Sequence, residues 1–333
     1  MTPVSPAYHR AYDLHGMRLD LRAAPAMGAL LDVFLRALRA VPVAGDDPPD
    51  VRLAFESGAE TIPGDAVALG KHERGVEAFE AGERLLLRYG ASVAALDPRA
   101  GTAAARIDPN LTNEETRRGL LFDFLILSLL ALLRPHGLYL LHAACLVRGD
   151  AGLLLSAQSG SGKSTLAMSL VQEGWGYLSD DILLLRERDG VVEALGMGRH
   201  FRLIPDALER FPGLAARASA SETFTDKHHL DVDALFPGRY TPRVVPRALV
   251  IPEIADRAVS ELSPLPASAA LLHMLGQTTF LARDARLADR HLATLRTLAL
   301  QVKTYRLKAG RDLYDEPTRA GALLTPLLDA RER

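Results

Sequence analysis

The chain has 333 residues, of which 48% are hydrophobic and 24% are charged, and its formal net charge is −2. A globular chain of this length buries a substantial apolar core in one or two domains. Its 39 basic and 41 acidic residues nearly balance, so no positive field recruits nucleic acid or anionic lipid, and neither is expected as a partner.

Cysteine usage and the N-terminal residues indicate a compartment. Cys145 is the one cysteine in the sequence, so no disulfide framework can form within the chain and a reducing environment is expected. Residues 1–16 lack the apolar run of a signal peptide. We therefore expect a cytoplasmic protein in which Cys145 is a small buried apolar residue.

The first third of the chain predicts a small α+β domain of short strands and loops. Residues 51–55 (VRLAF) read as a strand, and residues 83–96 read as a hairpin that turns near Tyr89 and Gly90. Breaks at 44–50 and 97–109 separate these elements because they are rich in turn-forming residues. We expect an accessory or oligomerisation domain over residues 1–110.

A strongly apolar segment follows at residues 120–133 (LLFDFLILSLLALL). It is shorter than the roughly 20 residues of a membrane-spanning helix and contains Asp123, which favours a buried core helix and no membrane partner. Thr112 and Glu115 predict a capping box at its start. Pro135 and Gly137 predict its end.

The chain then changes to alternating strands and helices. Residues 137–147 (GLYLLHAACLV) alternate as in one strand, and residues 153–156 predict a second strand that runs into a glycine-rich loop. A helix at 164–173, a short strand at 177–179 and two aspartates complete the order. This order of strand, loop, helix, strand and acid predicts an α/β domain over residues 111–333.

The loop at 157–164 (AQSGSGKS) matches the phosphate-binding pattern G-x-x-x-x-G-K-[ST], except that Ala157 replaces the first glycine. Small residues let backbone N–H groups face a polyphosphate, a lysine reaches its outer phosphates, and a serine hydroxyl binds Mg²⁺. A plain turn between strand and helix would not explain the lysine and serine that follow directly. Ala157 is compatible with this loop if its φ is negative. The predicted nucleotide-binding residues are Gln158, Ser159, Gly160, Ser161, Gly162, Lys163, Ser164 and Thr165.

Asp180 and Asp181 follow the next strand, where phosphate-binding-loop proteins hold Mg²⁺. Two acids allow a division of roles, in which one binds the metal ion and the other accepts a proton from a hydroxyl. The plainer interpretation is that one of them only caps a turn or forms a surface ion pair. His142, one strand before the loop, is either a core residue or a side chain near the phosphates.

These segments resemble the catalytic domain of HPr kinase/phosphorylase and its bacterial relatives, which share a core with the ATP-dependent phosphoenolpyruvate carboxykinases. The resemblance lies in LHAACLV at 141–147, GSGKST at 160–165 and GYLSDD at 176–181, in that order and at matching intervals. Looser similarity continues from LDVDALFPGR at 230–239 to YRLKAGRD at 305–312. The resemblance implies an α/β kinase domain of this type behind the α+β N-terminal domain.

The resemblance also implies roles for individual residues. It gives catalytic roles to Asp180 as the base for a seryl hydroxyl, to His142 near the transferred phosphate and to Lys163, and metal contacts to Ser164 and Asp181. The two aspartates remain interchangeable in this assignment. The implied cofactors are ATP and Mg²⁺, and the family likeness leaves a homo-oligomer open.

The expected function is therefore an ATP-dependent kinase that acts on a hydroxyl, with a serine of a protein or peptide as acceptor. Residues 194–206 (ALGMGRHFRLIPD) contain no EIRG-like stretch of the true HPr kinases, so HPr itself is not the expected acceptor, and a peptide-tailoring kinase fits better. Two alternatives stay open: a kinase of a small metabolite, and a nucleotide-binding regulator without transfer.

Several other polar residues are weaker candidates. Arg202 and Arg239 could bind phosphate oxygens, and Lys227 could lie near the γ-phosphate or belong to a solvated loop. His228 and His229 are neighbours whose side chains point to opposite faces of an extended chain, so a shared metal ion is not expected. Two helices at 268–277 and 286–302 are predicted scaffold, and they contain His273, His291 and an apolar stripe at Leu287, Leu292, Leu295 and Leu298.

Overall fold

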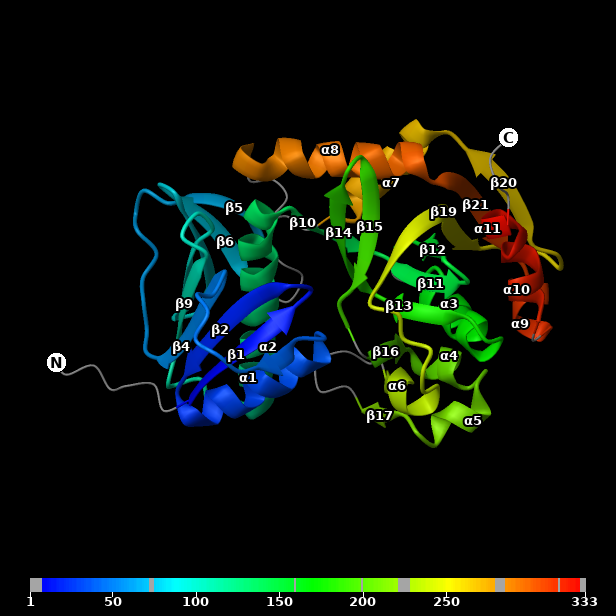
Figure 1. Cartoon of the computed structure of the whole chain (residues 1–333). Coiled ribbons are helices and arrows are strands. Elements are labelled where there is room, and N and C mark those ends of the chain that lie inside the picture. Colours follow the sequence, from blue (N-terminus) through cyan, green and yellow to red (C-terminus); the bar gives the residue numbers. More distant parts are fainter. Residues whose placement is uncertain are drawn as a thin grey trace. The chain divides into compact units, whose positions relative to one another are not determined.

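The computed structural model describes residues 8–71, 75–158, 160–198, 200–220, 228–278, 285–316 and 318–329. The chain forms two compact units, one built mainly from residues up to Leu138 and one mainly from residues from Tyr139 onward. Each unit combines helices with a large sheet, so the chain is of the mixed α/β class (Figure 1).

The sheet of the first unit has nine strands in the order β3-β1-β2-β4-β9-β8-β7-β6-β5. The β2–β4 and β4–β9 pairs are parallel and the other pairs are antiparallel. The strands are β1 (Tyr8–Leu14), β2 (Met17–Ala23), β3 (Val41–Val43), β4 (Val51–Ser57), β5 (Val67–Lys71), β6 (Glu77–Ala81), β7 (Arg84–Tyr89), β8 (Ser92–Asp97) and β9 (Thr102–Ile107).

The strand expectations for this unit are partly confirmed. Strands β7 and β8 form the predicted hairpin, with Tyr89 opposite Ser92 and Gly90 at φ +58° in the turn. The predicted break at 97–109 is wrong over much of its length, because β9 runs through it between β4 and β8. Its sequence, TAAARI, is rich in alanine, which is depleted in strands, so its composition hid the strand.

Two helices belong to the first unit, α1 (Pro25–Ala37) and α2 (Glu114–Leu133). Helix α2 packs against α1, β8 and β9, with Phe34 and Phe122 edge to face at 5.3 Å. These contacts group α2 with the first unit, whereas the sequence analysis placed the boundary before it, at 110/111. The apolar part of α2 has no polar face that would show which unit it packs against, so the sequence could not assign the helix to either neighbour.

The start of α2 differs from the predicted capping box. The side chain of Asn113, not that of Thr112, accepts a hydrogen bond from the backbone N–H of Thr116, at 2.8 Å. The helix continues into a 3₁₀ turn, Arg134–His136, and ends at Gly137 with φ +75°. Glu114–His136 is long and apolar enough to cross a membrane, but most of it is buried inside the protein, as in a core helix.

The main sheet of the second unit has the order β10-β14-β15-β19-β12-β11-β13, and β21 and β20 extend it from β19. A three-stranded sheet, β16-β18-β17, accompanies it. The strands are β10 (Leu138–His142), β11 (Ala144–Arg148), β12 (Ala151–Leu155), β13 (Gly176–Ser179), β14 (Ile182–Arg188), β15 (Val191–Gly196), β16 (His200–Leu203), β17 (Ser219–Ala220), β18 (His228–Asp231), β19 (Arg243–Ile254), β20 (Glu261–Leu265) and β21 (Lys303–Ala309).

Helices cover both faces of this sheet. One face packs against α3 and the C-terminal helices through residues such as Leu166 and Leu324, and the other packs against α7 and α8 through Met274, Leu295 and Leu298. The helices of the unit are α3 (Lys163–Gln172), α4 (Pro205–Leu208), α5 (Pro212–Ala215), α6 (Val232–Leu235), α7 (Ala267–Gly276), α8 (Ala285–Gln301), α9 (Asp312–Asp315), α10 (Arg319–Leu324) and α11 (Pro326–Asp329).

Residues 137–147 are not one strand, although their alternation is confirmed. Strand β10 ends at His142 beside β14, and β11 begins at Ala144 between β12 and β13. Leu141 and Cys145 contribute to the core on the α7–α8 face, whereas Ala144 contributes to the core on the α3 face. The alternation continues across the break at Ala143, so the pattern alone did not reveal it.

The buried stripe of α8 differs from the predicted one. Leu295 and Leu298 are fully buried, but Leu292 is 43% exposed. His291 lies on the buried side instead and stacks on Tyr139 at 4.9 Å, so it belongs to the scaffold as predicted. Because residue 292 lies about 100° around the helix from residue 291, a shift of one position moves Leu292 off the buried face.

Candidate functional site

The glycine-rich loop joins β12 to α3, as predicted. Gly160 and Gly162 have φ +83° and +84°, and these left-handed values favour glycine at both positions. The non-glycine residues with positive φ in the described part of the chain are His15, Arg39 and Asp189. Ala157 is therefore outside the left-handed region, which satisfies the condition set for its tolerance in the loop.

Two observations are consistent with a polyphosphate bound at the loop. A Cβ at Gly160 would meet no atom within 4 Å, so space is open next to the loop backbone. The Ser161 Oγ is buried and has no hydrogen-bond partner within the part of the chain that the structure describes. Gln158 is exposed, Ser164 is half-buried and Thr165 is buried. Ser159 lies outside the described residues.

Lys163 begins α3 and points across to the end of β13. Its side chain is 7% exposed, and its Nζ donates a hydrogen bond to the backbone oxygen of Asp180 at 2.7 Å. The same Nζ lies 3.6 Å from Asp181 Oδ1. The helix start and the strand end thus bring the lysine and the two acids together.

Asp181 is surrounded by three nitrogen donors. Its Oδ1 lies 3.1 Å from His142 Nδ1, and its Oδ2 accepts a hydrogen bond from Arg202 Nη2 at 2.5 Å, besides the contact with Lys163. His142 is placed by the end of β10, where its backbone N–H donates to the Gln277 oxygen at 3.2 Å. The predicted histidine, lysine and acid therefore meet at one carboxylate.

Asp180 has a different environment from its neighbour. It is 1% exposed, and its Oδ2 accepts a hydrogen bond from the backbone N–H of Arg202 at 2.9 Å. Burial, and next the charge of Asp181, raise the pKa of Asp180 to about 6, although Lys163 and Arg202 oppose the shift. This carboxyl therefore titrates close to neutral pH.

Arg202 is a weak candidate of the sequence analysis that the structure brings into the site. It lies on β16 opposite His229 of β18. His229 stacks against His200 with ring centroids 5.7 Å apart. Burial, followed by the charges of Arg202 and His200, lowers the pKa of His229 to about 4. In the sequence, this polar face is indicated only by the spacing of His200 and Arg202, which are two positions apart and therefore point to the same face of a strand.

A second group was missed because it depends on tertiary contacts. His273 of α7, predicted to be scaffold, has its Nε2 3.1 Å from the Oγ of Ser156, the residue just after β12. Ser156 is fully buried, and its Oγ donates to the His142 carbonyl oxygen at 3.3 Å. These contacts tie α7, the start of the loop and His142 together.

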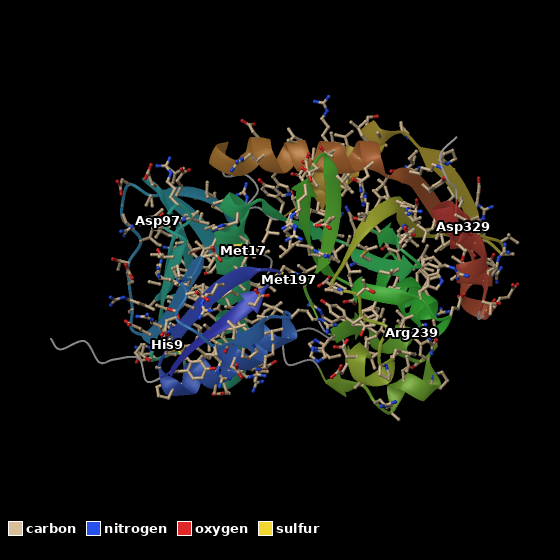
Figure 2. All side chains as sticks on the ribbon, in the orientation of Figure 1. His9, Met17, Asp97, Met197, Arg239 and Asp329 are labelled. Carbon is tan, nitrogen blue, oxygen red and sulfur yellow. The ribbon has the colours of Figure 1, made fainter. Side chains whose placement is uncertain are left out.

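Other candidate residues lie away from this cluster or remain undescribed. Arg239 lies beside Gly174, which follows the end of α3 opposite the loop, and Figure 2 labels its position. Lys227 lies outside the described residues. Cys145 is buried, and burial raises the pKa of its thiol, as expected for an apolar role. Among the residues described, no three His, Cys, Asp or Glu side chains are grouped as metal ligands.

No family model matches the chain. No curated protein matches it either. Among solved structures, the chain is similar to the Hpr(Ser) kinase/phosphatase from Coxiella burnetii, with 11% sequence identity, a TM-score of 0.30, and coverage of 56% of this chain and 98% of that chain. The relation is distant at this level of similarity.

Proposed function

We propose that the chain is an ATP-dependent kinase that transfers a phosphoryl group to a hydroxyl, with a serine of a protein or peptide as the acceptor. The observation that carries the proposal is the meeting of Lys163, Asp181 and His142 at the start of α3, directly after a loop with open backbone. A loop that only joined strand to helix would not need a buried lysine beside the carboxylate of Asp181. The resemblance of the three motifs to the HPr kinases supports the same proposal.

The residues of the loop would hold ATP and Mg²⁺. Backbone N–H groups of the loop and of the start of α3 would bind phosphate oxygens, and Lys163 would neutralise their charge. Ser164 and Asp181 are the proposed metal contacts, because a hydroxyl and a carboxylate are oxygen ligands that suit Mg²⁺. When bound, ATP·Mg²⁺ supplies the phosphoryl group and offsets its developing charge.

Asp180 is the proposed base. Its pKa of about 6 leaves most of it ionised at neutral pH and still basic enough to accept a proton from the acceptor hydroxyl. The backbone N–H of Arg202 fixes the buried carboxylate of Asp180. His142 adds a donor at the same cluster and keeps Asp181 in place.

The test is a transfer assay with ATP labelled at the γ-phosphate and Mg²⁺, using the purified protein and a cytosolic extract of its source, with products separated by size. Label on a protein or peptide supports the proposal and identifies the acceptor by mass. Label in the small-molecule fraction supports a metabolite kinase instead. Absence of enzyme-dependent label with every extract contradicts transfer and favours a nucleotide-binding regulator.

Three variants assign the roles within this assay. Asp180→Asn is expected to bind nucleotide like the parent and to lose transfer by about 100-fold or more, because it cannot accept a proton. Lys163→Ala is expected to weaken both binding and transfer. Asp181→Asn is expected to raise the Mg²⁺ concentration needed for half-maximal transfer. Transfer at the parent rate by Asp180→Asn would show that Asp180 is not the base.

A further inference from the structure

Arg202 contacts both acids of the candidate site with different parts of the same residue. Its backbone N–H donates to Asp180 Oδ2 at 2.9 Å, and its guanidinium Nη2 donates to Asp181 Oδ2 at 2.5 Å. Strand β16 lies at the edge of its three-stranded sheet, so the N–H of Arg202 is directed away from the β18 ladder and toward Asp180. One residue therefore links the two carboxyl groups.

Both oxygens of Asp181 are already engaged. Oδ1 lies against His142 and Lys163, and Oδ2 lies against Arg202. A divalent cation that coordinates Asp181 has to share its carboxylate oxygens with these donors or displace one of them. It also has to approach the guanidinium of Arg202, whose permanent positive charge opposes a second cation at short range.

We infer that the guanidinium of Arg202 occupies the metal position on Asp181 and excludes divalent cations until an anionic phosphate draws it away. This inference rests on the proposed nucleotide site. An arginine pairs with phosphate oxygens as well as with a carboxylate, so the same side chain can change partner when a triphosphate enters the loop. Metal ion and nucleotide then bind together. Arg202 acts as a positioning residue and takes no part in proton transfer.

The first test measures Mn²⁺ binding to the protein without nucleotide, by the electron paramagnetic resonance signal of free Mn²⁺. Arg202→Gln and Arg202→Met both remove the charge and keep the backbone N–H on Asp180. Each is expected to bind Mn²⁺ about tenfold tighter than the parent, the scale of one charge-assisted hydrogen bond. Arg247→Gln is the matched control, because Arg247 pairs with the exposed Asp150 and should leave Mn²⁺ affinity unchanged.

The second test repeats the titration with a non-hydrolysable ATP analogue. The analogue is expected to tighten Mn²⁺ binding strongly in the parent and less in Arg202→Gln, because the variant has no guanidinium to displace. Mn²⁺ affinity that is equal or weaker in both neutral variants without nucleotide overturns the inference. If the analogue changes neither protein while the variants still gain Mn²⁺ affinity, the nucleotide site is wrong and the exclusion by Arg202 stands.

Discussion

The two neighbouring aspartates show how much the surroundings of a residue decide its chemistry. The Asp181 side chain is 23% exposed and lies close to nitrogen atoms of His142, Lys163 and Arg202. Asp180 is almost fully buried and carries the raised pKa. A carboxyl whose pKa is raised to about 6 suits proton transfer. The raised pKa therefore supports Asp180 over Asp181 as the proposed base.

The raised pKa of Asp180 has a consequence for stability. The folded state binds the proton more tightly than the unfolded state, whose pKa is near 3.8, so this group contributes stability below about pH 4 that is lost as the pH rises through about 6. Asp180→Asn cannot ionise and is expected to unfold at higher denaturant concentration than the parent at pH 7.5. The expected gain is of the order of 3 kcal/mol, from a shift of about two pKa units at about 1.4 kcal/mol each.

Urea unfolding at pH 7.5 and at pH 4 measures this effect. The difference between Asp180→Asn and the parent should shrink toward pH 4, where the parent carboxyl is largely protonated. Asp150→Asn is the control, because Asp150 is exposed and should change stability little at either pH. An Asn variant less stable than the parent at pH 7.5 would mean that the buried charge of Asp180 is fully compensated.

At the scale of elements, residues 112–115 at the start of α2 offer two possible helix caps, one at Thr112 and one at Asn113. The structure assigns the cap to Asn113, one residue after the predicted Thr112. Asn113→Ala should therefore cost about 1 kcal/mol, since it removes the acceptor of the Thr116 N–H. Thr112→Ala should cost much less. Urea unfolding of the two variants checks the difference, and the reverse order would support the predicted capping box.

Elements with strong local signals were predicted well. The hairpin at Gly90, the apolar helix α2 and the order of strand, loop and helix around Lys163 depend on turn residues, periodicity and motif spacing that lie within short stretches. Elements whose structure depends on contacts with distant parts of the chain were not predicted well. Strand β9 is alanine-rich, the break at Ala143 keeps the alternation, and Leu292 is a leucine on the exposed side of α8.

The candidate site shows the same division between local and tertiary information. His142, Lys163 and the aspartate pair were predicted because they lie at motif positions, and the structure brings them together. Arg202 had only a weak signal, since no pattern states that β16 passes beside the end of β13. The contact of His273 with Ser156 had no signal, because it joins residues 117 positions apart.

At the scale of the whole molecule, the candidate site lies entirely within the second unit. Its residues come from β10, the loop with α3, the end of β13, and β16, all of which belong to that unit. The first unit has a core of its own, with Leu21, Leu53 and Leu87 almost fully buried in its sheet. The residues of the candidate site and the core of the first sheet therefore belong to different units.

This division predicts where nucleotide stabilises the chain. A ligand raises the free energy of opening only for the structure that binds it, by about 2.7 kcal/mol at a concentration 100 times its Kd. Amide hydrogen exchange with and without ATP·Mg²⁺ should therefore slow by up to about 100-fold in α3 and β13, and stay unchanged in β4 and β8 of the first unit. Lys163→Ala should abolish the slowing in α3. Equal slowing in β4 and β8 would show instead that the two units open as one cooperative structure, so that the first sheet is stabilised by a site to which it contributes no residue.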